Sequence, residues 1–146
     1  MTAARTGGTS NLVLATLCGL VMVGDIALAA IGSLMWSAYR QGSIEAADAA
    51  SFTMLAASAC VGAVVALLAA IALARGDRGH KLAQFARTVA LLRLVALAVA
   101  IVVIALTLGT KAVLGLAATF GILLAVGEAL GMLIVVGVAV RRTRRH

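Results

Sequence analysis

Long apolar runs separated by short polar segments are the dominant pattern of this chain. There are four such runs, and each reaches or exceeds the ~20 residues that an α-helix needs to cross the hydrocarbon core of a bilayer. The pattern therefore predicts four transmembrane helices in a single membrane domain, residues 1–146, that ends in a basic tail, residues 141–146. The predicted spans cover residues 12–36, 52–74, 88–108 and 113–140.

Composition supports a helical membrane protein. The chain is 64% hydrophobic, 12% charged and free of proline, and its mean hydropathy is +1.16. A soluble domain of this length would need far more polar surface, and a membrane β-barrel would show short alternating segments and aromatic girdles. We therefore expect an all-α integral membrane protein, a four-transmembrane-helix bundle with short loops. The first run is too long, and the segment before it too weakly basic, for a cleaved signal peptide.

The distribution of charge predicts the orientation of the bundle. The connection between the second and third runs and the C-terminal tail are rich in arginine, and Arg5 precedes the first run. The other two connections carry only Arg40 and Lys111, and Arg40 is offset by Glu45 and Asp48. Because basic residues collect on the cytoplasmic side, we expect a multi-pass protein of the inner, or cytoplasmic, membrane with both termini cytoplasmic. The cytoplasmic basic residues are Arg75, Arg78, Lys81, Arg87, Arg141, Arg142, Arg144 and Arg145.

The net charge of +7 follows from this topology and needs no nucleic-acid partner. Basic groups beside a membrane attract anionic lipid headgroups, by ~1 kcal/mol per residue. Aromatic residues are not interleaved with the basic ones as in a nucleic-acid-binding face, so we expect the partners to be the bilayer and its anionic headgroups. Leu82, Phe85 and Val89 lie at helical spacing, which favours a third helix that begins early, within the basic connection.

Small residues indicate where helices approach one another. Ser58, Gly62, Ala66 and Ala70 form a stripe with a period of four residues in the second span, and Gly127 and Gly131 form a GxxxG pair in the fourth. Such stripes let helix backbones pack closely. We interpret both as packing within the bundle, with a homodimer seam as the alternative. Cys18, Asp25 and Gly32 share one face of the first span at heptad spacing.

Two carboxylates and one arginine lie inside the predicted spans. Asp25 and Glu128 each lie ~18–20 Å from the cytoplasmic end of their helices, near the bilayer midplane. The Cα atom of Arg93 lies ~10 Å closer to the cytoplasm, so its side chain either points toward the carboxylates or extends to the headgroups. Ionisable groups at this depth are a functional-site hypothesis by default.

Three states of this intramembrane site are possible. Arg93 pairs with one carboxylate while the other is protonated, or both carboxylates are neutral and Arg93 turns to the headgroups. In the third state, a cation or basic substrate lies between two ionised carboxylates. Ionising both of two neighbouring carboxylates in a low dielectric is energetically unfavourable, so we expect at least one of them to be protonated.

No other pattern indicates chemistry. Cys18 and Cys60 lie in opposite halves of their spans, and His80 and His146 are isolated, so we predict no catalytic residue, metal site or cofactor. The leading hypothesis is a non-enzymatic accessory or stabilising subunit that binds another membrane subunit or itself. The alternative is a small transporter or channel, coupled to protons or cations, that uses Asp25 and Glu128. A phage-type holin is a third possibility, supported only by size, span number and basic tail.

Overall fold

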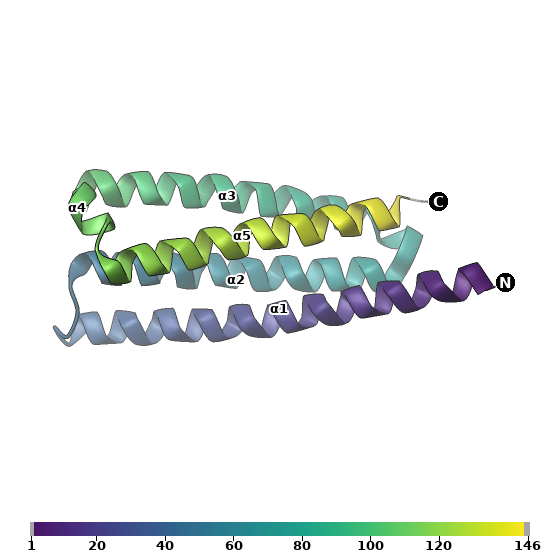
Figure 1. Cartoon of the computed structure of the whole chain (residues 1–146), viewed down its shortest axis with the longest axis horizontal. Coiled ribbons are helices and arrows are strands. Elements are labelled where there is room, and N and C mark those ends of the chain that lie inside the picture. The colour runs from purple at the N-terminus through teal and green to yellow at the C-terminus, as the bar shows by residue number, and fades with distance from the viewer. Residues whose placement is uncertain (1, 145–146) are drawn as a thin grey trace.

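Long helices make up nearly all of the computed structural model, which describes residues 2–144 (Figure 1). Four helices are long and apolar enough to cross a membrane, so the prediction of an all-α, four-transmembrane-helix bundle is confirmed, and the chain is a small multi-pass membrane protein. In chain order the elements are α1 (Thr2–Arg40), α2 (Ala46–Arg75), the 3₁₀ turn η1 (Gly76–Gly79), α3 (His80–Leu108), the single-turn α4 (Thr110–Val113) and α5 (Leu116–Thr143).

Each long helix extends past at least one end of the apolar run that predicted it. Helix α3 begins at His80, inside the basic connection, as the spacing of its apolar residues suggested. The fourth long helix begins at Leu116 rather than at residue 113. Helix α3 ends before Gly109, whose φ of 88° lies in a region that L side chains rarely adopt, and the non-helical backbone of Gly115 separates α4 from α5. The chain turns at Gly109, forms α4 across the end of the bundle, and only then enters α5 (Figure 1).

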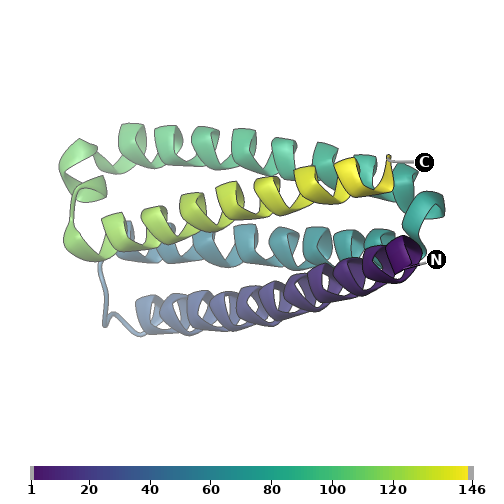
Figure 2. The ribbon, with the colours of Figure 1, turned by 45° about the vertical axis from the view of Figure 1, so that its right-hand side comes forward.

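Helix α2 is the central helix of the bundle. It packs against α1, α3 and α5, and α3 also packs against α5, whereas α1 packs along α2 and barely approaches the others (Figures 1 and 2). The buried positions of α1 recur every seven residues, at Cys18, Asp25 and Gly32. Gly32 is required there, because a Cβ atom would lie 2.6 Å from the carbonyl oxygen of Phe52. Helix α1 is thus attached along one narrow seam.

The core is built mainly from alanine and a few larger side chains. The inner face of α5 carries Ala125, Ala129, Met132 and Val136, which repeat with the period of an α-helix. Small side chains let the helices approach closely, which replaces the hydrophobic effect as the source of stability inside a bilayer. The large exposed apolar residues, such as Leu106, face outward and suit contact with acyl chains.

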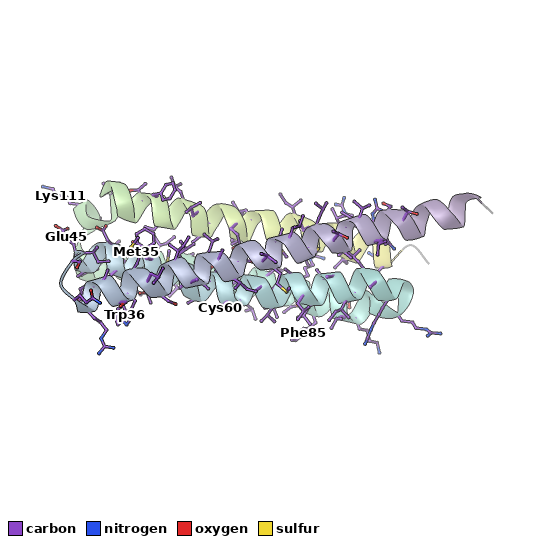
Figure 3. The ribbon with its side chains drawn as sticks, turned by 90° about the horizontal axis from the view of Figure 1, so that it is seen from below. Met35, Trp36, Glu45, Cys60, Phe85 and Lys111 are labelled. Atoms are coloured by element: carbon purple, nitrogen blue, oxygen red, sulfur yellow. The ribbon has the colours of Figure 1, made fainter. Side chains whose placement is uncertain are left out.

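The two ends of the bundle differ in composition. Both termini and η1 lie at one end, together with the arginine-rich segments (Figure 1). Trp36, Glu45 and Lys111 lie at the opposite end (Figure 3). There the rings of Trp36 and Tyr39 are in contact, with centroids 5.5 Å apart. Such amphipathic rings are typical of a membrane–water interface.

Candidate functional site: an arginine between two buried carboxylates

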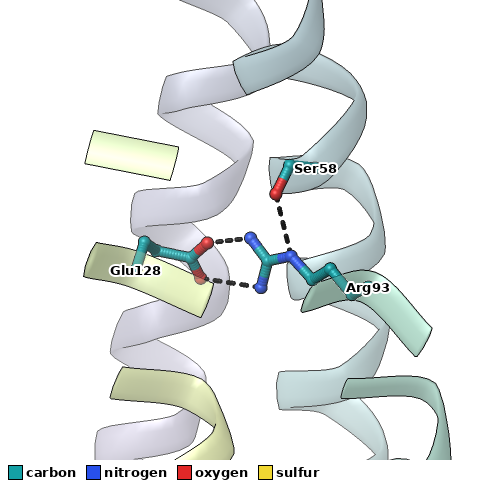
Figure 4. A network of polar contacts seen from close by, with 3 residues as sticks. All are labelled: Ser58, Arg93 and Glu128. Atoms are coloured by element: carbon teal, nitrogen blue, oxygen red, sulfur yellow. Dashed lines mark hydrogen bonds and ion pairs between the residues drawn. The ribbon is translucent and has the colours of Figure 1, made fainter. Parts of the chain in front are cut away.

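The centre of the site is an ion pair between α3 and α5. The Arg93 Nη1 atom donates to Glu128 Oε1 at 3.2 Å, and Nη2 pairs with Glu128 Oε2, so the contact is bidentate (Figure 4). Arg93 belongs to the inner face of α3, in line with Ala86, Ala90 and Leu97, which is why its side chain points into the bundle. Its side chain is 3% exposed and that of Glu128 is 17% exposed. The pair is therefore shielded, with the carboxylate at its more open side.

A serine from the central helix completes the coordination of the guanidinium group. Arg93 Nε donates to Ser58 Oγ on α2 at 2.9 Å (Figure 4). Arg93 thereby links three helices, α2, α3 and α5. The sequence indicated Ser58 only as a packing residue, although a hydroxyl within a stripe of Gly and Ala was the available signal.

Asp25 lies beside this network without joining it. Its side chain comes from α1, the residue is 1% exposed, and neither carboxylate oxygen has a hydrogen-bond partner among the described residues. It approaches the arginine over Gly62 on α2. A Cβ atom at Gly62 would lie 2.7 Å from Asp25 Oδ2 and 2.6 Å from Arg93 Nη1. The two side chains are thus near neighbours that share the space over Gly62, and only glycine leaves this space free for them.

The ion pair is the one that the first of the three states considered above requires, with Glu128 as the carboxylate that pairs with Arg93. Asp25 makes no hydrogen bond among the described residues, although the Arg93 guanidinium group lies close to it over Gly62. The side chain of Arg93 extends toward the carboxylates and not toward the headgroups.

Small residues of α2 occupy the positions where the other helices meet. Ser58, Gly62 and Ala66 are buried, and Ala70 is partly buried. Gly62 does more than permit close packing, because its missing side chain leaves the space that Asp25 and Arg93 occupy.

The interpretation of the glycine pair in α5 as packing within the bundle is wrong. Gly127 and Gly131 lie on the outer face, where a Cβ atom would meet nothing within 4 Å. The cause is the helical period: with Ala125, Ala129 and Met132 facing inward, the positions of the two glycines point outward. The alternative, a seam with another chain, stays a prediction.

The basic residues gather at the end of the bundle that carries the termini. All of those whose side chains are described are exposed, and Arg145 lies outside the described residues. Arg142 differs from the rest because its Nη1 atom bonds to Ser10 Oγ, which joins the end of α5 to the start of α1. The exposed side chains are those of Arg75, Arg78, Lys81, Arg87, Arg141, Arg142 and Arg144.

The two cysteines and His80 are not part of the intramembrane site. Cys18 is buried on α1, Cys60 is exposed on α2, and both are free thiols. His80 Nδ1 lies 3.1 Å from Thr143 Oγ1, which ties α3 to α5 near their basic ends. Among the described side chains, no group of three His, Cys, Asp or Glu residues could hold a metal ion.

Comparison with known proteins gives no relative: no family model, no curated protein and no solved structure matches this chain.

Proposed function

We propose that this membrane protein is a small, non-enzymatic transporter or channel linked to protons, in which Asp25, Arg93 and Glu128 are the working groups. The observation that carries the proposal is Asp25. The contacts of Arg93 with Glu128 and Ser58 already tie three helices together. Asp25 adds no hydrogen bond to them. A buried acid that makes no bond costs stability, and such groups occur at functional sites.

The proposed chemistry is an exchange of partners. In the first arrangement Arg93 pairs with the Glu128 carboxylate, as in the structure, and we assign the one proton of the site to Asp25. In the exchanged arrangement Arg93 pairs with the Asp25 carboxylate, and Glu128 holds the proton. The site carries one proton and no net charge in either arrangement, so each is tolerable in a low dielectric. The net result is movement of one proton from Asp25 to Glu128.

The structure provides the space that this exchange requires. The side chains of Asp25 and Arg93 already meet over Gly62, so the guanidinium group needs only a short movement to reach Asp25. Ser58 holds the Nε atom, so the group can turn about that anchor while its two Nη atoms change partners. A Gly62→Ala substitution would place a Cβ atom 2.6 Å from Arg93 Nη1 and 2.7 Å from Asp25 Oδ2, so it should displace both groups and obstruct the exchange.

Access to Asp25 requires movement of helices. The residue is 1% exposed, so the observed conformation is closed to both membrane surfaces. Helix α1 is the helix best able to move, because it packs mainly along α2 and has few contacts with the other helices. Cys18 lies on the same seam two turns earlier and is fully buried, so its reactivity reports whether the seam opens.

The test is proton flux into vesicles that contain the purified protein and a pH-sensitive dye. External acidification is applied alone and against an outward gradient of Na⁺, K⁺ or tetraethylammonium. The wild-type protein should exceed empty vesicles in at least one condition, and Asp25→Asn should reduce the flux to the level of empty vesicles, because an amide cannot take up and release a proton near neutral pH. Gly62→Ala should reduce it as well.

Matched variants separate the site from general damage. Gly127→Ala changes a glycine beside Glu128 that meets nothing within 4 Å, and it should keep full flux. Cys18 labelling, compared between the wild type and Asp25→Asn at acidic and alkaline pH, should depend on pH more strongly in the wild type. Flux at the level of empty vesicles in every condition, or full flux in the double variant Asp25→Asn with Glu128→Gln, would overturn the proposal.

A second candidate function is that of an accessory or stabilising subunit of a membrane complex, or of a homo-oligomer. The observation that favours it is the outward face of α5, where Gly127 and Gly131 leave room for another helix. Under this alternative, replacing both glycines with leucine should abolish co-purification of a partner chain or shift the oligomeric state. Asp25→Asn should then be without effect.

We also propose that the end with the termini faces the cytoplasm. The support is the concentration of arginine at that end, which follows the positive-inside rule. In a variant without Cys18 and Cys60, a cysteine at position 45 should react with an impermeant reagent in intact cells. A cysteine at position 78 should react only after permeabilisation, and the reverse pattern would overturn the orientation.

A further inference from the structure

A second charged site lies between α3 and α5, on the side of the intramembrane triad toward the end of the bundle that carries the termini. It is a cavity of about 320 Å³. Three arginines surround it, and its remaining lining is apolar. The lining residues are Arg87 and Leu91 from α3, and Leu133, Gly137, Val140, Arg141 and Arg144 from α5.

The three guanidinium groups have no counter-ion in the described part of the chain. All three arginines are exposed, and none of them forms an ion pair or a side-chain hydrogen bond with another described residue. The lining of the cavity includes no carboxylate. Three positive charges around one hollow repel each other unless an anion lies between them. The planar fork of arginine matches phosphate oxygens in particular.

The apolar part of the lining narrows the choice of anion. Leu91 and Leu133 lie about one and two helical turns deeper in the bundle than the arginines of their own helices. Gly137 opens the space between, because a Cβ atom there would meet nothing within 4 Å. A cavity with a cationic rim and an apolar interior suits a molecule that carries a phosphate attached to a hydrocarbon chain.

We propose that this cavity binds the headgroup of an anionic phospholipid. The phosphate would lie among Arg87, Arg141 and Arg144, and the first part of an acyl chain would run along Leu91 and Leu133. Basic pockets between membrane helices on the cytoplasmic side bind anionic headgroups in this way. This inference is independent of the proton-linked function.

The chain itself offers a matched control for ordinary surface attraction. Arg75, Arg78 and Lys81 lie at the same end and are equally exposed, but they line neither this cavity nor the triad. Replacing them with glutamine removes the same number of charges. A diffuse electrostatic attraction would respond to both sets of changes alike, whereas a built site responds only to the three arginines around the cavity.

The experiment measures binding of phosphatidylglycerol to the full-length protein in detergent, by native mass spectrometry and by titration. We expect one tightly held lipid in the wild type. Replacing Arg87, Arg141 and Arg144 together with glutamine should weaken its binding by at least about tenfold. The control triple variant at residues 75, 78 and 81 should change the affinity by less than about threefold.

A second pair of variants tests the cavity without changing any charge. Gly137→Leu should fill the space and displace the lipid, whereas Gly131→Leu, on the outer face of the same helix, should not. Phosphatidylcholine should not be retained, and inorganic phosphate should compete only weakly because it lacks the acyl chain. Equal losses in the two triple variants, unchanged binding in Gly137→Leu, or full competition by inorganic phosphate would each overturn the proposal.

Discussion

Asp25 and Glu128 are two acids in similar local sequence and at similar depth, yet their side chains have different partners in the bundle. Each directly follows a glycine, in the segments VGD and VGE, and each lies near the middle of its helix. Glu128 is held by a bidentate contact with Arg93, whereas Asp25 has no hydrogen-bond partner among the described residues. The difference comes from the neighbouring helix: α5 packs against α3, which supplies an arginine, and α1 packs along α2, which supplies glycine and alanine. Residue type and depth alone do not determine how a buried acid is stabilised.

The largest expected effect is that of removing the shared cation. Arg93→Met leaves Glu128 buried without its partner, and breaking one side of a buried pair costs about 3 kcal/mol. We expect a lower unfolding temperature in detergent and a lower membrane yield. The double variant Arg93→Met with Glu128→Met removes both charges and should recover most of the loss. An unchanged unfolding temperature in the single variant would show that the pair contributes nothing.

A double-mutant cycle tests whether Asp25 can replace Glu128. In Glu128→Gln, Arg93 loses its anionic partner, so Asp25 should ionise and take its place. Asp25→Asn should therefore be nearly neutral in the wild type but cost about 1 kcal/mol more in the Glu128→Gln background. For the same reason, Glu128→Gln should lose stability more steeply than the wild type as the pH falls, because protonation of Asp25 removes the remaining counter-ion. Strict additivity would mean that Asp25 cannot reach Arg93.

The next largest effect is expected at Ser58, which accepts the hydrogen bond from Arg93 Nε in both of the arrangements proposed for the site. Ser58→Ala removes the acceptor of the Arg93 Nε atom, and interhelical hydrogen bonds in membrane proteins contribute about 1 kcal/mol. We expect a modest fall in the unfolding temperature. Ser33→Ala is the control, because the Ser33 hydroxyl bonds to Ala29 of its own helix. Equal effects of the two substitutions would show that the bond to Ser58 has no special role.

The smallest effect is expected at the glycines that precede the two acids. Gly24 and Gly127 meet nothing within 4 Å, so alanine at either position should change stability by less than about 0.5 kcal/mol. Thermal unfolding of the isolated protein measures this. A loss of oligomeric state in Gly127→Ala alone would instead identify α5 as an interface and support the subunit alternative.

The fold could be predicted from the sequence because the bilayer imposes length and polarity on each helix. Runs of sufficient length predicted the four spans, and the early start of α3 followed from the spacing of Leu82 and Phe85. The end of α3 at Leu108 was predicted, whereas the single-turn α4 and the break at residues 114–115 before α5 were missed, because these residues continue the apolar run and Gly115 is one of 15 glycines.

The candidate site could be predicted less completely than the fold. Depth along each helix brought Asp25, Glu128 and Arg93 together as candidates. Which carboxylate pairs with Arg93 depends on which helices are neighbours, and the pattern of hydropathy does not indicate which helices are neighbours. The contact of Ser58 with Arg93 and the outward direction of Gly127 depend on how each helix is rotated about its axis. The sequence does not determine this rotation, because small residues occur on several faces of the helices.

The position of Arg93 between acids on the first and last helices has a consequence for biosynthesis. During translation α1 leaves the ribosome first and α5 last, so Arg93 enters the membrane before Glu128 does. An arginine at the centre of a lone span costs about 2.5–3.5 kcal/mol on insertion, and during that interval Asp25 is the intramembrane acid already present. Asp25 would then act as a temporary counter-ion during assembly. In chains truncated before α5, Asp25→Asn should therefore reduce insertion of α3, whereas the full-length chain should tolerate the same change.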